Sequence, residues 1–365
     1  MTRLNLIRFF NQNKWLGILR RIPRRLNLRL RFSVLFSWCM LLSACSGGAD
    51  AAFKDYQQHL ERLLEQAAPT APQANPQTIP TVSSQRLDVA RVSLSLLDSM
   101  RLNHCTLGQL VAERNSSLGK VRSPSAQLFY ELQLIPALRS CIAQGNLSTD
   151  LASQLESALA QKQAQRSTVI HNFLTTDEHI RALLRPSVAN LNAPLSDSDM
   201  ESILLAAQAL AAILDALDKP EQLNEEQWLQ HIRVLGQHSS QRAHWGSYWQ
   251  TLNHSVAKLD QLTGLLQQAQ SLNCREGQPN QTARYLSNVL LGPYTDTIQA
   301  TMAQLDQLGR TLAPLLQRMS AYSETESWRT YLQYLEAQIY EIPRASQQHA
   351  EAWQQLLAPC GLMPQ

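Results

Sequence analysis

The stretch SDSDMESILLAAQALAAILDALDKP, residues 196–220, decides the fold class of this chain. Its apolar residues recur at alternating spacings of three and four, which is the period of one face of an α-helix. The residues in this register are Met200, Ile203, Ala207, Leu210, Leu214 and Leu217. Further apolar residues between them widen the face, so the pattern predicts a helix buried in a bundle rather than a two-stranded coiled coil. Ser196 and Asp199 resemble a capping box at its start, and Pro220 is expected to end it.

The same period continues on both sides of this stretch. It predicts an all-α, elongated multi-helix bundle in which short loops place neighbouring helices antiparallel. Residues 187–195 are a candidate boundary between two sub-bundles, and a weak alternation over residues 86–92 allows one short strand. The other predicted helices span about residues 51–66, 94–103, 106–114, 123–144, 148–174, 177–184, 225–237, 244–272, 283–291, 294–319, 328–342 and 346–357.

A proline-rich segment separates the first of these helices from the helical body. Pro69, Pro72, Pro76 and Pro80 block helix formation and favour an extended backbone. We therefore expect residues 51–85 to form a helix followed by an extended strap over the surface. Residues 86–365 are expected to form the helical body.

The first 44 residues have the three parts of a secretory signal. Residues 1–31 carry nine Lys or Arg and no Asp or Glu, and an 11-residue apolar run from Phe32 to Leu42 follows. That run is too short to span a bilayer, which needs about 20 residues. No later apolar segment is long enough either, so the sequence predicts no membrane-spanning helix.

Leu42-Ser43-Ala44-Cys45 resembles the lipobox of bacterial lipoproteins, in which a signal peptidase cuts before a cysteine that carries a diacylglycerol. We therefore expect residues 1–44 to be a lipoprotein signal peptide, Cys45 to be acylated and residues 45–50 to form a short tether. An ordinary cleaved signal and a retained anchor are the alternatives. Because Ser46 is not the aspartate that resembles an inner-membrane retention signal, we expect the periplasmic face of the outer membrane.

Loss of the predicted signal reverses the charge of the chain. The whole chain has 32 Lys and Arg against 29 Asp and Glu, a net charge of +3. The part after residue 44 keeps 23 of the basic residues and all 29 acidic ones, a balance of −6. The basic excess therefore belongs to the signal, and nucleic acid is not an expected partner.

Four cysteines follow Cys45, and an even number in an oxidising compartment predicts two disulfides, with three possible connectivities. Cys105 begins one predicted helix and Cys141 lies near the end of the next, so antiparallel packing brings them together. Cys274 and Cys360 each follow the end of a helix, and we expect them to form the second pair. The spacings match no zinc pattern.

The segment RLNHCTLGQLVAERNSSLGKVRSPSAQLFYE, residues 101–131, resembles the signature of the proteobacterial lipoprotein family catalogued as the domain of unknown function numbered 3080. The resemblance extends from the helix after Cys45 to the helix that contains Trp353. It implies a lipoprotein signal, a helical body and no assigned activity, so it supplies no catalytic residues.

One polar cluster is a candidate binding site for an anion or a glycan. Arg114 and Lys120 would hold negative charge, and Asn115 would offer hydrogen bonds. The competing interpretation is a structured turn in which these groups cap the backbone. The cluster consists of Glu113, Arg114, Asn115, Ser116, Ser117, Lys120 and Glu131.

The remaining polar and aromatic clusters give weaker signals. His231 and His238 are seven residues apart, which is not the spacing of a helical metal pair, so no metal site and no cofactor are expected. A region rich in tryptophan and tyrosine suits core packing or, alternatively, the stacking of a sugar. Its members are Trp228, Trp245, Tyr248 and Trp249. No catalytic sequence motif is present.

These observations favour a non-enzymatic, lipid-anchored protein that binds a partner in the cell envelope, either a protein or a glycan. One alternative is a hydrolase of peptidoglycan or another glycan that uses Glu113 or Glu131 as its carboxylates. The other alternative is a carrier of small ligands, which would need a sizeable apolar cavity between helices.

Overall fold

The computed structural model describes residues 49–71, 77–91, 101–120, 122–186, 195–220, 224–240, 244–275 and 277–362. The chain divides into two units, Met1–Ser46 and Gly47–Gln365, and all the described residues belong to the second. The predicted signal peptide, Cys45, most of the tether and most of the helix expected over residues 94–103 lie outside the described residues.

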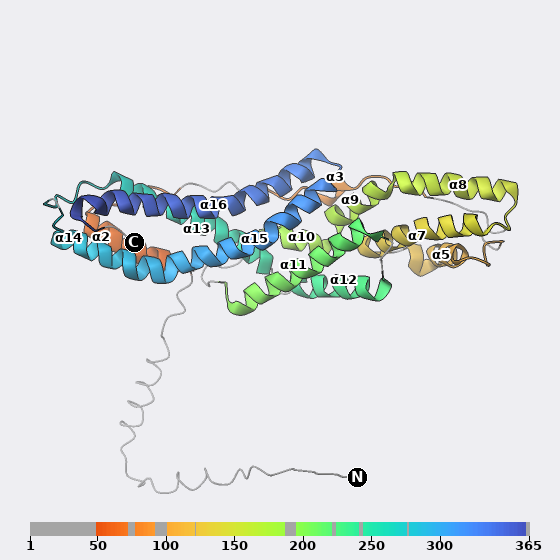
Figure 1. Ribbon diagram of the computed structural model, residues 1–365, viewed down its shortest axis with the longest axis horizontal. Coiled ribbons are helices and arrows are strands. Elements are labelled where there is room, and N and C mark those ends of the chain that lie inside the picture. Colours follow the sequence, from red (N-terminus) through yellow and green to blue (C-terminus); the bar gives the residue numbers. More distant parts are fainter. Residues whose placement is uncertain are drawn as a thin grey trace, which may run out of the picture. The chain divides into compact units, whose positions relative to one another are not determined.

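The prediction of an all-α bundle is confirmed, and Figure 1 shows the helices of the second unit packed side by side. The first half contains α2 (Ala49–Leu64), α3 (Val82–Gln85), α5 (Thr106–Asn115), α6 (Ser117–Lys120), α7 (Pro124–Gln144), α8 (Thr149–Ala164), α9 (Arg166–Thr176) and α10 (Glu178–Leu184). The second half contains α11 (Asp197–Asp218), α12 (Glu225–Ser240), α13 (His244–Gln268), α14 (Gln281–Val289), the π-helix η3 (Leu290–Gln299), α15 (Ala300–Ala321), α16 (Glu326–Leu357) and the 3₁₀ turn η4 (Ala358–Cys360).

Helix α11 has the register and the start that its sequence predicts. The Ser196 hydroxyl accepts the Asp199 N–H and the Asp199 carboxylate accepts the Ser196 N–H, which is a complete capping box. Ile203, Leu210 and Leu214 are fully buried among α12, α13 and α15. Burial of this face against several helices is what makes a bundle more stable than an isolated helix.

Helix α11 is also long and apolar enough, by length and composition alone, to cross a membrane, which the sequence prediction had not anticipated. The structure gives its apolar character another reason, because half of its most apolar window is buried inside the bundle. Its last turn carries Asp215 and Asp218, and both carboxylates pair with Arg318 of α15. The helix therefore has the contacts of a core helix.

The strand that residues 86–92 allow is absent from residues 86–91, which the structure describes. Instead, the side-chain amide of Asn172 pairs with the backbone of Leu87: Oδ1 accepts the Leu87 N–H at 2.8 Å, and Nδ2 donates to the Leu87 carbonyl at 2.7 Å. A helix side chain therefore satisfies the backbone groups that a neighbouring strand would have satisfied.

Three predicted helix boundaries are wrong. The helix expected over 148–174 is broken at Gln165, which separates α8 from α9. Conversely, Pro343 does not end a helix, because it lies inside α16, a continuous helix of 32 residues. The apolar face of α16 packs against α13 and α15 on both sides of the proline, and this burial offsets the roughly 3 kcal/mol that an internal proline costs. Likewise, the expected break at 291–294 is the π-helix η3, which carries the chain past Pro293.

Two of the prolines before α3, Pro69 and Pro80, contact the bundle through their carbonyl groups. Gln261 donates to the Pro69 carbonyl at 2.7 Å, and Arg181 donates to the Pro80 carbonyl at 2.6 Å. These bonds hold both ends of the segment on the bundle, and residues 72–76 between them lie outside the described residues.

Two hydrophobic cores lie within this unit. The larger includes side chains of α2 and of α9 to α16, and the smaller joins α5, the second half of α7 and α8. The two cores meet within α7, with Leu128 in one core and Leu138 in the other. The predicted sub-boundary at residues 187–195 stays a prediction, because residues 187–194 lie outside the described residues. Leu184 and Ile203 flank that segment and share the larger core, because α10 packs against α12 and α13.

Both predicted disulfides are present. Cys105–Cys141 joins α5 to α7 in the smaller core, and Cys274–Cys360 joins the segment after α13 to the last turn of the chain. In the chain-entropy model the first stabilises the fold by about 4 kcal/mol and the second by slightly more, because it closes the longer loop.

Helix α2 is locked into the larger core by a chain of buried hydrogen bonds. Thr263 donates to the Leu259 carbonyl at 2.7 Å, so its oxygen accepts the Nδ1–H of His349 at 2.9 Å. The other ring nitrogen, Nε2, then accepts from Tyr56 at 2.8 Å, and the Tyr56 oxygen accepts the Trp353 indole N–H at 2.8 Å. Each of these four side chains has its hydrogen-bond partners only when His349 is neutral and carries its proton on Nδ1.

We expect this network to make the protein sensitive to acid. Complete burial lowers the pKa of His349 to about 3, whereas an unfolded histidine titrates near 6.5. The contribution of His349 to the unfolding free energy is therefore complete above pH 6.5 and declines as the pH falls towards 3. Between about pH 7.5 and pH 5 the wild type should lose about 2 kcal/mol more unfolding free energy than His349→Gln, measured by denaturant titration. His171 and His254 are common to both proteins, and parallel pH profiles would contradict the assignment.

Candidate functional site

The polar cluster of residues 113–120 forms the turn between α5 and α6. The Ser116 hydroxyl donates to the Glu113 carbonyl at 2.7 Å and accepts the Gly119 N–H at 3.0 Å, while Arg114 donates to the Gly119 carbonyl. These are the bonds of the structured-turn interpretation. Glu113, Asn115 and Ser117 remain exposed. Binding of an anion or glycan at this turn stays a prediction, and the Lys120 side chain lies outside the described atoms.

Glu131 does not lie in an open cleft with Glu113. It is buried in α7, where its carboxylate lies 2.9 Å from the ammonium of Lys162 in α8 and accepts a hydrogen bond from Gln127 at 2.9 Å. Lys162 is also buried and donates to the Ala90 carbonyl at 3.1 Å. Both charges are thus compensated and hydrogen-bonded, which is the condition for tolerating a buried ion pair. The arrangement offers no support for Glu131 as a catalytic acid or base.

The aromatic region around α12 and α13 is core. Trp228, Trp245, Tyr248 and Trp249 are all buried, so none offers a face for a sugar. Trp228 lies between Phe129 and Phe173, with ring centroids 5.9 and 6.0 Å away. The stacking interpretation is therefore wrong for these four side chains, and packing accounts for them.

The histidines in this region serve separate structural contacts. His238 shares a hydrogen bond of 2.9 Å with Ser202, and His254 Nε2 lies 3.2 Å from the carboxylate of Asp50. Burial lowers the pKa of His254 although Asp50 opposes the shift. Among the described residues, one group of three potential metal ligands is found: His104, Cys105 and Cys141. Its two sulfurs are joined in the disulfide and are not thiolates.

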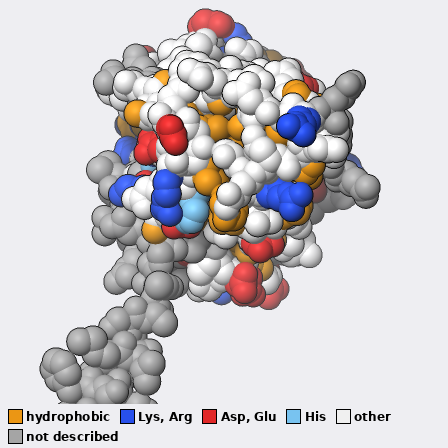
Figure 2. All heavy atoms as spheres, turned by 90° about the vertical axis from the view of Figure 1, so that its left-hand side faces the viewer, with side chains coloured by type: hydrophobic (Ala, Val, Ile, Leu, Met, Phe, Trp, Pro, Cys, Tyr) orange, Lys and Arg blue, Asp and Glu red, His pale blue; other side chains and the backbone are white. Residues whose placement is uncertain are grey.

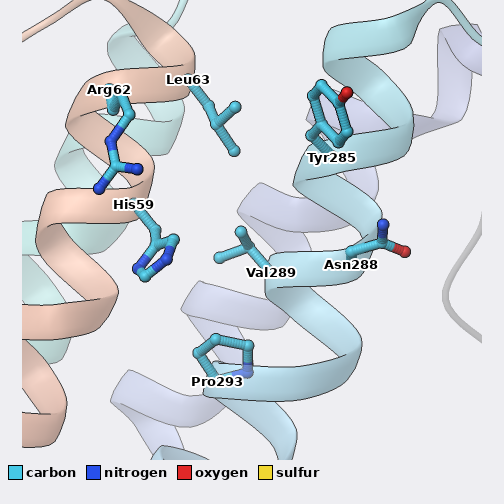
Figure 3. A pocket seen from close by; sticks show the side chains of 7 residues that line it. All are labelled: His59, Arg62, Leu63, Tyr285, Asn288, Val289 and Pro293. Carbon is cyan, nitrogen blue, oxygen red and sulfur yellow. The ribbon is translucent and has the colours of Figure 1, made fainter.

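The described surface does contain a groove of about 330 Å³, between α2 on one side and α14 with η3 on the other (Figure 3). Helix α2 contributes His59, Arg62 and Leu63, while Tyr285, Asn288, Val289 and Pro293 line the opposite wall. It exists because the two helices meet through inward residues, as where the Tyr56 and Tyr294 rings lie 5.7 Å apart, and diverge at the surface. Both walls belong to helices that the larger core holds in place.

The groove combines apolar walls with polar groups at its rim. Leu63, Val289 and Pro293 give the apolar surface, and Arg62 and His59 bring hydrogen-bond donors from α2. His59 is oriented by the Asp55 carbonyl, 2.8 Å from its Nδ1. Among the described residues Arg62 has no ion-pair partner, so its charge is available to a ligand. Such a site can bind a partially apolar, negatively charged surface, but it contains no nucleophile with an adjacent base.

Sequence reasoning missed this groove. Its members come from helices more than 200 positions apart, and no spacing rule joins them. A signal was nevertheless present, because Tyr285 falls outside the apolar register of α14, whose buried residues are Ala283, Leu286 and Val289. A large apolar residue on the polar face of an amphipathic helix is a reason to look for a surface contact.

The fold is a disulfide-linked helical bundle with a groove on its surface. The chain belongs to the family described as Protein of unknown function (DUF3080), whose model matches residues 53–364. The match therefore includes most of α2, the groove and both disulfides. No curated protein and no solved structure matches the chain.

Removal of the Lys162 charge should destabilise the fold if Lys162 compensates the buried charge of Glu131. We expect Lys162→Met to lower the unfolding free energy by about 3–5 kcal/mol, because the Glu131 carboxylate stays buried without its partner. The double variant Lys162→Met/Glu131→Leu should recover most of that loss, and Glu113→Gln should change stability by less than about 0.5 kcal/mol. Denaturant titration of the wild type, Lys162→Met, Glu131→Leu and the double variant measures the coupling, with Glu113→Gln as the control. Additive effects of the two single variants would show that the pair does not act as a unit.

Proposed function

We propose that the protein is a non-enzymatic lipoprotein of the cell envelope that is anchored through acylated Cys45 and binds or scaffolds a partner there. The observation that carries this proposal is the position of α2. It begins at Ala49, four residues after Cys45, and its residues Phe53, Tyr56 and Leu60 are buried in the larger core. A lipid on Cys45 would thus hold the start of α2 within about 14 Å of the membrane, the reach of four extended residues, and the rest of the bundle is packed on α2.

The alternatives receive less support. The hydrolase needs two accessible carboxylates, whereas Glu131 is buried and paired with Lys162. The carrier needs a cavity that encloses its ligand, whereas the groove between α2 and α14 opens on the surface (Figure 3). An open groove suits the docking of another surface. The outer membrane is the proposed location, because Ser46 follows Cys45.

Acylation of Cys45 is tested by metabolic labelling. Wild-type protein expressed with a radiolabelled or clickable fatty acid should carry the label, and Cys45→Ala should not, because the thioether sulfur is lost. Cys39→Ala, which removes the other cysteine of the N-terminal segment, is the matched control and should label like the wild type. Label that persists in Cys45→Ala would refute the anchor.

Partner binding is tested by photo-crosslinking in cells. A photoreactive amino acid at Asn115 or Ser117, both exposed in the polar turn, should give one recurrent adduct. The same amino acid at Gln304, an exposed position on α15, should not give it. Mass spectrometry of the adduct identifies the partner. Uncrosslinked monomer at every position would count against a partner at this turn.

A further inference from the structure

The outer face of α14 and η3 exposes two large apolar side chains close together in sequence. Leu291 is 64% exposed and Tyr285 is 48% exposed. The other exposed large apolar residues that the structure describes stand singly on α3, α12 and α16: they are Val82, Leu229 and Tyr340. The α14–η3 face is thus where the described surface concentrates such side chains, and it adjoins the groove that Tyr285 lines. Clustered apolar exposure indicates a contact surface.

Few charged side chains lie on this face. Arg284 is the one charged residue among residues 277–295, and the exposed Asp296 of η3 follows them. Arg284 is exposed, as is Arg62 across the groove, and among the described residues neither forms an ion pair. Figure 2 looks onto the end of the bundle that bears α2 and α14, and it shows hydrophobic side chains gathered among Lys, Arg, Asp and Glu side chains. The two exposed arginines and the apolar side chains suit a partner that has apolar and negatively charged groups.

The length of the chain relates this face to the anchor. Four residues join Cys45 to Ala49, a reach of about 14 Å. Along α2, thirteen residues separate Ala49 from Arg62, a rise of about 20 Å. Helix α14 and η3 both pack against α2, and the groove uses His59, Arg62 and Leu63 from the last turns of α2. The face therefore lies within a short distance of any membrane to which Cys45 is attached.

We propose that the α14–η3 face, with the adjoining rim of the groove, docks on the phospholipid bilayer that anchors Cys45. Leu291 and Tyr285 enter the boundary between headgroups and acyl chains, where an aliphatic side chain and an amphipathic aromatic ring are both favoured. Arg62 and Arg284 contact anionic headgroup phosphates. This inference rests on the proposed anchoring and adds an orientation to it. The lipid supplies attachment, and the face fixes which side of the bundle meets the membrane.

Docking in this way leaves the polar turn free. In Figure 1, α5, α7 and α8 lie at the end of the bundle opposite α2 and α14. The turn of residues 113–120 belongs to that opposite end, so it takes no part in the docked face. A partner in the periplasm then meets the exposed Asn115 and Ser117 rather than the membrane-facing groove.

Tryptophan quenching tests the docking. The lipid-labelled mature protein, purified from membranes, is reconstituted into vesicles of phosphatidylethanolamine and phosphatidylglycerol with brominated acyl chains. In the variant Leu291→Trp, the added emission should fall at least about twofold relative to unbrominated vesicles. The matched control is Leu229→Trp, at an exposed leucine on α12, and it should lose little emission. The five tryptophans of the described body are buried and give the same background in both variants.

The charge contribution is tested in the same assay. Adding Arg62→Glu and Arg284→Glu to Leu291→Trp should abolish most of the quenching, as should vesicles of phosphatidylethanolamine and phosphatidylcholine alone. Circular dichroism melting confirms that each variant is folded. Lipid-labelled Leu291→Trp that is not quenched, or equal quenching of both tryptophan variants, overturns the docking and leaves the anchor standing. A product without lipid label overturns the anchoring itself.

Discussion

The hydrogen-bond chain from Trp353 through Tyr56 and His349 to Thr263 connects helices from the two ends of the chain. Tyr56 and Trp353 are 297 positions apart, and all four side chains are buried. A buried polar group without a partner costs about 1–3 kcal/mol, so such a chain is stable only when every member is in place. Helix α2 is thereby fixed against α13 and α16. Because α2 is the element nearest Cys45, the same contacts couple any anchor to the whole bundle.

Buried charge and surface charge have different roles in this molecule. The buried pair of Glu131 and Lys162 links α7 to α8 where the two cores meet, and its neighbours satisfy its remaining hydrogen bonds. Glu131, which resembles a catalytic carboxylate in the sequence, therefore serves a structural ion pair. Arg62 and Arg284 lie instead on the surface beside exposed apolar side chains, and there the charge is available to a partner. The functional hypotheses therefore rest on the surface of the bundle rather than on its interior.

The predicted helices were right where local signals agree and wrong where packing overrides them. The capping box at Ser196 and Asp199 depends on neighbouring residues, and so does the start of α7 at Ser123 and Pro124. Helix breaks were expected after residues 291 and 342, and these are the breaks that contain Pro293 and Pro343, residues that an isolated helix does not tolerate in its interior. In the bundle, α16 is buried on both sides of Pro343, and this burial holds the helix together. The break at Gln165, between α8 and α9, contains no proline or glycine that could have predicted it.

The sequence by itself determined the fold class and the capped helices, because helical period and caps are local properties. It also predicted both disulfide pairs, but only through the expected antiparallel packing of the helices that carry the cysteines. It also indicated a signal and a lipid anchor, which remain proposals. The tertiary structure alone decided which polar residues are buried. It paired Glu131 with Lys162, placed four aromatic rings in the core and brought His59 and Arg62 opposite Tyr285. These contacts join helices far apart in the chain, and their partners are chosen by packing, which no local pattern encodes.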